Sequence, residues 1–576
     1  MALRLFIYSA RIMSIGTALE FIGLYRPLKK TLRYLTDTQY LRNELEVRAD
    51  LRCTRKAVGN WAAQGAEYAN PNRLFAVVSF TNLPMHAKFH CLAAKAMQLR
   101  GYTPLIFTHS SSRFAHKYFR MFGIDRLVIW DEYVKQVVSP DEVQVLEEQL
   151  LPSTQDVPTI MKVKFHGVEI GKHALSMTAR RRVQGRLDLS DPQTWALFQK
   201  EFYRAVESVL AAGRFFDQNP VEKMLVRDLG YTPNGAIYET ALLLGTDCVV
   251  YEQGQRRHTW ILKRYTPETK GKHFFSLSDA TWEKVKQQPW TSEDDARLER
   301  EFAGRYKPDS EDDTRRLMYG KRIKPPEEVR AQLGLDPSKK TAVIFSHVAW
   351  DAAFFYGTCL FDDFESWLYE TVKFVASECP QLNWIVKLHP LNAFKLQREI
   401  VREESEIRLL RTLMPLPEHI KIMRADTDIN TQSLFPLVDF VLTVNGTVGM
   451  EFPCYGIPAI VAGSGRYEGQ GFTMDARTRD EYFSILKNLH DIPRLDAEAR
   501  RLARKHFYTL VTRRQFSLED VAPMELKRFH EAQSNVHDNI HFVARSLEEF
   551  KISPSASLLG EWLAHSREPD LLVPLS

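Results

Sequence analysis

The feature of this sequence that most restricts its fold is a repeated alternation of short apolar runs with helix-length segments. A first series of runs is followed, after a charged stretch, by a second series. The first series comprises residues 73–80, 102–109, 126–134 and 247–254, and the second comprises residues 341–348, 383–390, 440–444 and 458–463. Strands that alternate with helices are typical of parallel sheets with crossover helices. The alternation therefore predicts an α/β fold with two Rossmann-type domains.

The same pattern divides the chain into five predicted segments. They are an N-terminal helical region (1–70), a first Rossmann-like domain (71–264), a helical linker (265–338), a second Rossmann-like domain (339–495) and a C-terminal helical extension (496–576). The linker is densely charged, and Pro325 and Pro326 mark a helix start within it. Because the charged stretch separates two alternating blocks, we expect it to join two separate sheets.

Charge and cysteine usage narrow the class of protein. The net charge of +5 over 576 residues is too small to indicate nucleic-acid binding, and it suits an anionic substrate or an anionic membrane surface. The six cysteines contain no CxxC pair, which favours a reducing cytoplasm over a disulfide framework or a zinc site. No window reaches the ~18 apolar residues of a membrane span. We predict a cytoplasmic protein.

The N-terminal residues 1–35 leave two readings open. They mix apolar residues with arginines and lysines, and no small-residue cleavage site follows, so they do not form a clean signal peptide. They fit a basic amphipathic helix lying on a membrane, but the interpretation that we favour is a helix packed on the first domain. Peripheral membrane contact is therefore one alternative.

A polar turn follows the run at 440–444, where ligands of parallel sheets are bound. The turn consists of Asn445, Gly446, Thr447, Val448 and Gly449. Its glycines allow a close backbone approach, and free N–H groups at the start of the next helix suit a phosphate. Asn445 and Thr447 either cap that helix or donate to phosphate oxygens. Glu451 either accepts hydrogen bonds from a ribose diol or is a surface acid near the positive end of the helix dipole.

Two further strand ends of the second series carry candidate residues. His389 and Pro390 follow one run, and the histidine either donates to a phosphate or belongs to a simple turn. His347 and Asp351 follow another run. Asp351 is a candidate base, nucleophile or acceptor-binding group, with a helix cap as the plain alternative.

The first series carries its own candidates. His86 and His90 are four residues apart on one predicted helix face, but no third ligand accompanies them, so we predict no metal site. Acceptor binding or packing are the remaining roles for this pair. Glu252 ends a predicted strand and is followed by Arg256 and Arg257, which either meet a phosphate or are solvated loop charges.

Several of these segments resemble the bacterial capsule polysaccharide biosynthesis family, which includes the capsular β-Kdo transferases, within the GT-B glycosyltransferases. The resemblance is closest over residues 340–490 and looser over 70–260. The matching stretches are residues 348–371, 387–390, 426–463 and 466–473, with 236–254 in the first half. The resemblance implies a GT-B-like fold, in which two Rossmann-type domains face a central cleft, with additional N-terminal helices.

The resemblance also implies roles for the candidate residues. The first domain (71–264) would bind the acceptor, and the second (339–495) would bind a nucleotide sugar, for which a CMP-linked donor is one candidate. The turn at 445–449 and His389 would hold its phosphate, and Glu451 its ribose. Asp351 is our first choice for the base that activates the acceptor, and His347, Glu252 and His86 are the other catalytic candidates. GT-B enzymes usually need no metal, so we expect no metal and no cofactor beyond the donor; Asp362 and Asp363 are the acidic pair to revisit if a metal is required.

The implied function is transfer of a sugar to a growing cell-surface polysaccharide, capsular or of lipopolysaccharide type, or to its lipid-linked precursor. Three alternatives stay open. A nucleotide-sugar 2-epimerase would act without an acceptor, a teichoic-acid-type glycerophosphotransferase would use a CDP-alcohol, and a non-catalytic carbohydrate-binding protein would bind no nucleotide.

Overall fold

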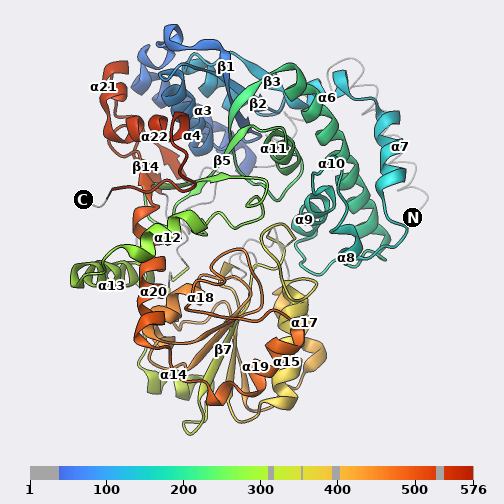
Figure 1. Ribbon diagram of the computed structural model, residues 1–576, viewed down its shortest axis with the longest axis vertical. Coiled ribbons are helices and arrows are strands. Elements are labelled where there is room, and N and C mark those ends of the chain that lie inside the picture. The colour runs from blue at the N-terminus through green and yellow to red at the C-terminus, as the bar shows by residue number, and fades with distance from the viewer. Residues whose placement is uncertain are drawn as a thin grey trace.

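The computed structural model describes residues 38–308, 317–318, 320–351, 354–391, 403–526 and 538–574. Two sheets form separate domains, drawn one above the other in Figure 1, and the linker helices α12 (Asp279–Gln287) and α13 (Ser292–Tyr306) lie beside their junction. This arrangement confirms the predicted α/β fold with two Rossmann-type domains. Residues 1–35, for which a membrane-surface helix was one alternative, lie outside the described residues.

The first sheet has seven strands in the order β13-β6-β5-β4-β1-β2-β3. The five strands β5, β4, β1, β2 and β3 are parallel. Strands β6 and β13 are antiparallel additions at the edge next to β5. The strands are β1 (Asn70–Ser79), β2 (Tyr102–Thr108), β3 (Leu127–Ile129), β4 (Val221–Val226), β5 (Asp247–Gln253), β6 (Thr259–Tyr265) and β13 (Phe516–Ser517). The run at 126–134 was expected to be one strand, but β3 ends at Ile129 and a helix begins at Trp130.

Helices cover both faces of this sheet. They are α3 (Thr38–Val58), α4 (Pro84–Gln98), α5 (Arg113–Met121), α6 (Trp130–Val137), α7 (Pro140–Leu150), α8 (Val157–Ile160), α9 (Ile170–Arg182), α10 (Pro192–Gln218) and α11 (Asn234–Leu243). The longest, α10, starts where the Asp191 side chain accepts the Thr194 N–H and Pro192 occupies the first turn, which is favourable helix-start chemistry.

The second sheet is entirely parallel, in the order β12-β11-β10-β7-β8-β9. Its strands are β7 (Thr341–Phe345), β8 (Asn383–Lys387), β9 (Ile420–Met423), β10 (Phe440–Thr443), β11 (Ala459–Val461) and β12 (Met474–Asp475). Along β7, Ala342 and Ile344 enter one core and Val343 and Phe345 enter the other. Both faces are therefore buried, which explains the continuous apolar runs in the sequence.

The helices of the second domain and of the linker have clear local causes. In the second domain they are α15 (Phe364–Glu378), α17 (Ser405–Leu410), α18 (Val448–Glu451) and α19 (Arg479–Lys487), and in the linker α12 (Asp279–Gln287), α13 (Ser292–Tyr306) and α14 (Pro326–Leu333). Asp363 caps α15 by accepting the Ser366 N–H at 2.7 Å. Thr291 and Asp294 form a reciprocal capping box at the start of α13.

The C-terminal segment 496–576, expected as a helical extension, also contains strands and returns to the first domain. After α20 (Ala497–Tyr508), strand β13 pairs with β6, a hairpin forms from β14 (Met524–Leu526) and β15 (Asp538–Ile540), and α21 (Leu547–Ile552) and α22 (Pro554–Ala564) follow. Helix α22 shares a core with α4, and Figure 1 shows this red segment beside the blue N-terminal helices. Strands of two or three residues are too short to give a periodic signal, so the sequence did not reveal them.

Helices that could cross a bilayer are absent from the part of the chain that the structure describes.

Candidate active site between the two domains

A cavity of about 560 Å³ lies between the domains, at the carboxyl ends of β4 and β5 on one side and of β7, β8 and β10 on the other. This is where parallel α/β sheets bind ligands. The cavity brings together most of the predicted site residues. They are Glu252, His347, Asp351, His389, Pro390, Asn445, Gly446, Thr447 and Glu451. His86 and Gly449 do not line it.

The polar turn after β10 is held by side chains from two neighbouring segments. The hydroxyl of Thr443 accepts the Gly446 N–H at 2.9 Å, the guanidinium of Arg466 donates to the Asn445 carbonyl at 2.9 Å, and the Tyr467 hydroxyl donates to the Gly446 carbonyl at 2.8 Å. Asn445 does not cap the following helix, because the residue at the cap position is Thr447, whose side chain makes no capping hydrogen bond. The helix predicted after this turn is a single α-turn, Val448–Glu451, that continues as a 3₁₀ turn over Phe452–Tyr455.

Gly449 has a packing role next to this turn. A Cβ at this position would collide with the hydroxyl of Tyr467, which is buried. We expect Gly449→Ala to lower the free energy of unfolding by about 1–3 kcal/mol, because the buried tyrosine must shift and lose its bond to the Gly446 carbonyl. Chemical denaturation measures this loss. Gly304→Ala in α13 is the control, since a Cβ there meets nothing within 4 Å; equal stability of the two variants would contradict the packing role.

Glu451 is buried, with 2% of its surface exposed, so the alternative of a surface acid is wrong. One carboxylate oxygen accepts from the guanidinium of Arg305 at 2.7 Å, and the other accepts from the hydroxyl of Tyr306. Arg305 also donates to the hydroxyl of Thr447 at 3.4 Å. Arg305 and Tyr306 end helix α13, so the linker supplies part of the site.

The side of the cavity formed by the second domain is basic. Lys387 ends β8, and burial lowers the pKa of its ammonium group to about 7. The backbone N–H of His389 donates to the Ser346 hydroxyl at 2.9 Å, and its Nδ1 accepts the Leu391 N–H at 3.3 Å. The neutral ring of His389 therefore carries its proton on Nε2. Together with Arg466, these residues give this wall the hydrogen-bond donors that a phosphate requires.

His347 ties two strand ends together. Its Nε2 accepts the Val444 N–H at 3.0 Å and contacts the Thr443 hydroxyl at 3.1 Å, which places the ring proton on Nδ1. Burial, together with the charge of Arg466, lowers the pKa of His347 to about 3. A ring with this pKa is a poor proton acceptor near neutral pH, so His347 serves better to position the turn than as a base.

The side of the cavity formed by the first domain and by the loop after β7 carries three carboxylates, Asp228, Glu252 and Asp351. Asp351 accepts from the Tyr231 hydroxyl at 2.6 Å, and Glu252 accepts from Arg227 Nε at 2.9 Å. Burial raises the pKa of Glu252 to about 7; Arg227 opposes this shift, and Asp228 and Asp351 add to it. Asp228 has a backbone φ of 60°, a conformation that is uncommon outside glycine and often found at functional sites.

His86 lies behind this acidic wall. Its Nε2 accepts from Arg227 at 2.9 Å, and its Nδ1 lies 3.3 Å from the Tyr251 hydroxyl, which also contacts His90. Burial lowers the pKa of His86 well below its usual value. His86 therefore orients Arg227, which in turn contacts Glu252. Among the described residues, no group of three or more His, Cys, Asp or Glu side chains forms a metal site.

Three other sequence candidates lie outside the cavity. Arg256 pairs with Glu301 on α13 at 3.4 Å, and neither it nor Arg257 lines the cavity. Asp362 pairs with Arg479 at 2.8 Å on the surface.

The sequence did not indicate several residues that line the cavity. They are Arg180, Arg227, Asp228, Tyr231, Arg305, Tyr306, Lys387 and Arg466. Assigning β4 as a strand would have found the group that follows it, because Arg227, Asp228 and Tyr231 stand at its carboxyl end.

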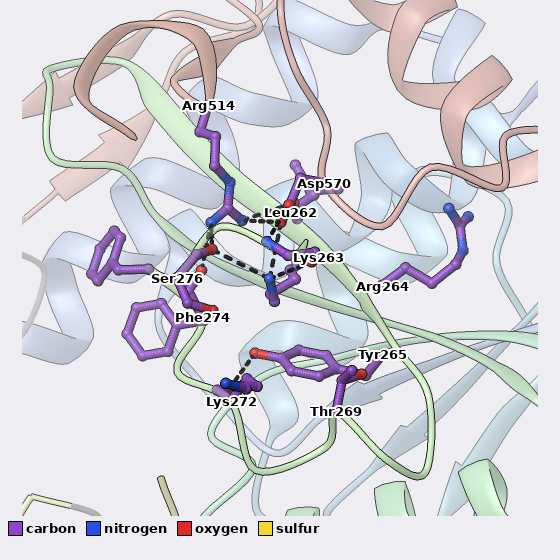
Figure 2. A network of polar contacts seen from close by, with 12 residues as sticks. Leu262, Lys263, Arg264, Tyr265, Thr269, Lys272, Phe274, Ser276, Arg514 and Asp570 are labelled. Atoms are coloured by element: carbon purple, nitrogen blue, oxygen red, sulfur yellow. Dashed lines mark hydrogen bonds and ion pairs between the residues drawn. The ribbon is translucent and has the colours of Figure 1, made fainter. Parts of the chain in front are cut away.

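The aromatic residues Phe274 and Phe275 form one wall of the cavity. A buried ionic cluster holds the loop that contains Phe274 in place (Figure 2). Arg514 donates to the carbonyls of Phe274 and Ser276 at 2.8 and 2.6 Å. Lys263 of β6 and Arg514 both pair with Asp570, at 3.1 and 3.4 Å. The C-terminal segment thus reaches the cavity wall through Asp570.

Comparisons with known proteins agree with the resemblance noted in the sequence. Residues 315–506 match the family model described as capsule polysaccharide biosynthesis protein, which confirms the predicted resemblance over that range. No curated protein sequence matches the chain.

Solved structures that resemble the chain are distant. The β-Kdo 2,4-transferase of KpsC from Thermosulfurimonas dismutans is 13% identical and matches over 55% of this chain and 84% of its own, with a TM-score of 0.32. The β-Kdo 2,7-transferase of the same KpsC is 15% identical and matches over 51% of this chain and 79% of its own, with a TM-score of 0.29. The UDP-GlcNAc 2-epimerase of Neisseria meningitidis, bound to UDP-GlcNAc, is 11% identical and matches over 76% of this chain and 96% of its own, with a TM-score of 0.25. Likeness at this level assigns no substrate.

Proposed function

We propose that this chain is a glycosyltransferase that moves a sugar from a nucleotide-sugar donor to a growing capsular or lipopolysaccharide-type polysaccharide, or to its lipid-linked precursor. The observation that carries the proposal is one cavity between two Rossmann-type domains, with a basic wall on one side and carboxylates on the other. The match of residues 315–506 to the capsule biosynthesis family supports it independently.

The basic wall is proposed to bind the donor phosphate. Lys387, His389 and Arg466 line the cavity beside the 445–449 turn, and cations placed there stabilise the nucleotide as it leaves. We propose metal independence on the same ground, since the side chains already supply the positive charge. Glu451 is proposed to face the ribose while holding Arg305 and Tyr306, because a carboxylate has lone pairs beyond the two that these residues use.

The acidic wall is proposed to bind and activate the acceptor. The acceptor hydroxyl oxygen forms the new bond to the anomeric carbon, the bond from that carbon to the donor phosphate oxygen breaks, and Glu252 takes the hydroxyl proton. Glu252 is favoured over Asp351 because a base acts best when its pKa is near the working pH, and burial brings the pKa of Glu252 to about 7. Asp351 and Asp228 then orient the acceptor.

We propose that the protein uses this donor in the cytoplasm and that the protein contacts the inner membrane peripherally. All six cysteines are free, which suits a reducing compartment. A binding screen by calorimetry with CMP-, UDP-, GDP- and CDP-linked sugars tests the donor; a CMP-linked sugar is one candidate. Absence of affinity for every nucleotide tested would contradict the proposal.

Lys387→Met is expected to weaken nucleotide binding by roughly 10–100-fold, the usual loss for a charge-assisted hydrogen bond. The pKa of Lys387 is about 7, so the unliganded ammonium loses its proton as the pH rises through neutrality. Affinity should therefore fall between pH 6 and 8 in the native protein and stay flat in the variant. Calorimetry checks both effects. Lys421→Met, on the neighbouring strand β9, is the control; equal affinities of the two variants would remove Lys387 from the site.

A further inference from the structure

Helices α3 and α5 together present an exposed basic surface on the first domain. It consists of Arg48, Arg52, Arg55 and Lys56 on α3, and of Arg113, Lys117 and Arg120 on α5. We name these seven residues the α3/α5 basic surface. The two helices pack against each other, and residues from both line a shared groove.

This surface is not neutralised by carboxylates of the described chain. Within the described residues, Arg48 pairs with Glu44 at 2.8 Å, and the other six cations form no ion pair or side-chain hydrogen bond. Helix α5 contains no Asp or Glu. On α3, Asp50 points inward, where it pairs with Lys88 at 2.8 Å. Six exposed cations without a carboxylate partner among the described residues, gathered on two packed helices, form a surface whose charge suits an anionic partner.

The groove between the helices is amphipathic. Its volume is about 420 Å³, and it is lined by four cations together with Leu45, Leu51 and Met121. Leu45 is 55% exposed, and Leu41, one turn earlier on α3, is 36% exposed. Cations around exposed leucines match the boundary between phosphate headgroups and acyl chains, where arginine pairs with phosphate and leucine enters the apolar layer.

We propose that the α3/α5 basic surface binds an anionic lipid bilayer. The sequence immediately before α3 is also basic, with Arg26, Lys29, Lys30 and Arg33, so the charge extends along the chain. A nucleic acid fits less well, because the surface offers exposed leucines rather than aromatic side chains for stacking. This inference does not depend on the proposed sugar transfer, since it concerns contact with the membrane and not with the sugar substrates.

The test is co-sedimentation of the full chain with vesicles of phosphatidylcholine, with and without phosphatidylglycerol. The native protein should pellet only with the anionic vesicles, and high salt should release it. Replacing Arg52, Arg55, Lys56 and Lys117 with Gln should weaken the partition by roughly 100-fold or more, at about fivefold per basic residue near the surface. Glutamine keeps helix propensity, so folding should persist.

The matched control removes the same charge from the second domain, by Gln substitution of Lys339, Lys340, Arg477 and Lys487. This control should bind anionic vesicles almost as tightly as the native chain. An equal loss of vesicle binding in both variants would mean that only net charge matters, and it would overturn the proposal. Unchanged binding by the variant that lacks the four α3/α5 cations would show that another segment contacts the lipid, and it would overturn the proposal too. Tighter binding to a DNA or RNA duplex than to the vesicles would also overturn it.

Cys53 gives a direct local readout. It is the one exposed cysteine among the six, and it lies between the cations of α3. Cys359 is half-buried, and burial raises the pKa of its thiol to about 12, so it reacts slowly with maleimides. A polarity-sensitive probe on Cys53 should shift its emission to the blue with anionic vesicles and be quenched by spin-labelled lipids. An unchanged spectrum during co-sedimentation would contradict contact through this surface.

Discussion

Glu252→Gln is expected to lower the rate of sugar transfer by roughly 10²–10⁴-fold, the usual contribution of a positioned general base. Glutamine keeps the shape of the side chain and an oxygen that accepts from Arg227 Nε, whose present distance to Glu252 is 2.9 Å. It cannot take a proton from the acceptor. Nucleotide affinity should therefore stay close to the native value while turnover falls. Steady-state transfer and calorimetry measure the two quantities separately.

The pH dependence gives the same assignment a second test. The pKa of Glu252 is raised from 4.5 to about 7, so the base is protonated in acid and becomes active as the pH rises through 7. The native rate should rise over that range, and the residual rate of Glu252→Gln should not.

Ionising a group whose folded pKa is raised destabilises the fold. The free energy of unfolding of the native protein should therefore fall between about pH 4.5 and 7, by roughly 1–3 kcal/mol, relative to the variant.

Glu222→Gln is the control, because Glu222 lies on the neighbouring strand β4, pairs with Arg73 on the surface and does not line the cavity. It should leave rate and pH profile unchanged. Full activity in Glu252→Gln together with a large loss in Asp351→Asn would move the base to Asp351, the residue that the sequence favoured first.

Asp570→Asn is expected to lower the free energy of unfolding by about 3–5 kcal/mol, the cost of leaving a buried charge without its partner. Asp570 is fully buried and faces two cations, Lys263 and Arg514. Lys263 and Arg514 hold the pKa of Asp570 well below its usual range against the effect of burial, so the carboxylate is ionised at neutral pH. Removing its charge leaves both cations buried together (Figure 2). Denaturation by urea measures the loss.

Glu568→Gln is the matched control, two residues earlier in the same segment. Glu568 pairs with Lys284 at 2.7 Å, but both side chains are more than half exposed, and such pairs contribute about 0–1 kcal/mol. The two variants should therefore differ by several kcal/mol. If Asp570→Asn were as stable as Glu568→Gln, the buried cluster would not hold the C-terminal segment to the cavity wall.

The second domain was largely predictable from the sequence, because its strands are buried on both faces and end in polar turns. The carboxyl ends of β7, β8 and β10 meet at one edge of the sheet, so His347, His389 and the 445–449 turn come together as expected. The position of the ligand-binding edge follows from the topology of such sheets.

The first domain was harder to predict because one of its central strands does not look like one. Strand β4 has the sequence VEKMLV, and Glu222 and Lys223 interrupt its apolar run. Both are tolerated because they stand at the amino end of the strand, where Lys223 pairs with Asp247 at 2.6 Å. Because the sequence pattern does not reveal β4, it also does not reveal Arg227 and Asp228, which directly follow this strand.

Long-range contacts account for the remaining differences. Arg305 and Tyr306 meet Glu451 across about 145 residues of sequence, and no local pattern reveals such a pairing. Likewise, the sequence shows that Glu252 and Asp351 are acidic but not which of them is buried. Burial is a property of the assembled cavity, and it reverses our order of preference for the base.

The most direct test of the central claim is transfer of a radiolabelled sugar from each nucleotide-sugar donor to a lipid-linked or oligosaccharide acceptor. The native chain should transfer the label from one donor, release its nucleotide only when the acceptor is present, and keep its rate in EDTA. Glu252→Gln should bind the same donor and transfer almost no label. Conversion of the donor without an acceptor, as a 2-epimerase would perform, or strict dependence on added Mg²⁺ or Mn²⁺, would contradict a metal-independent glycosyltransferase.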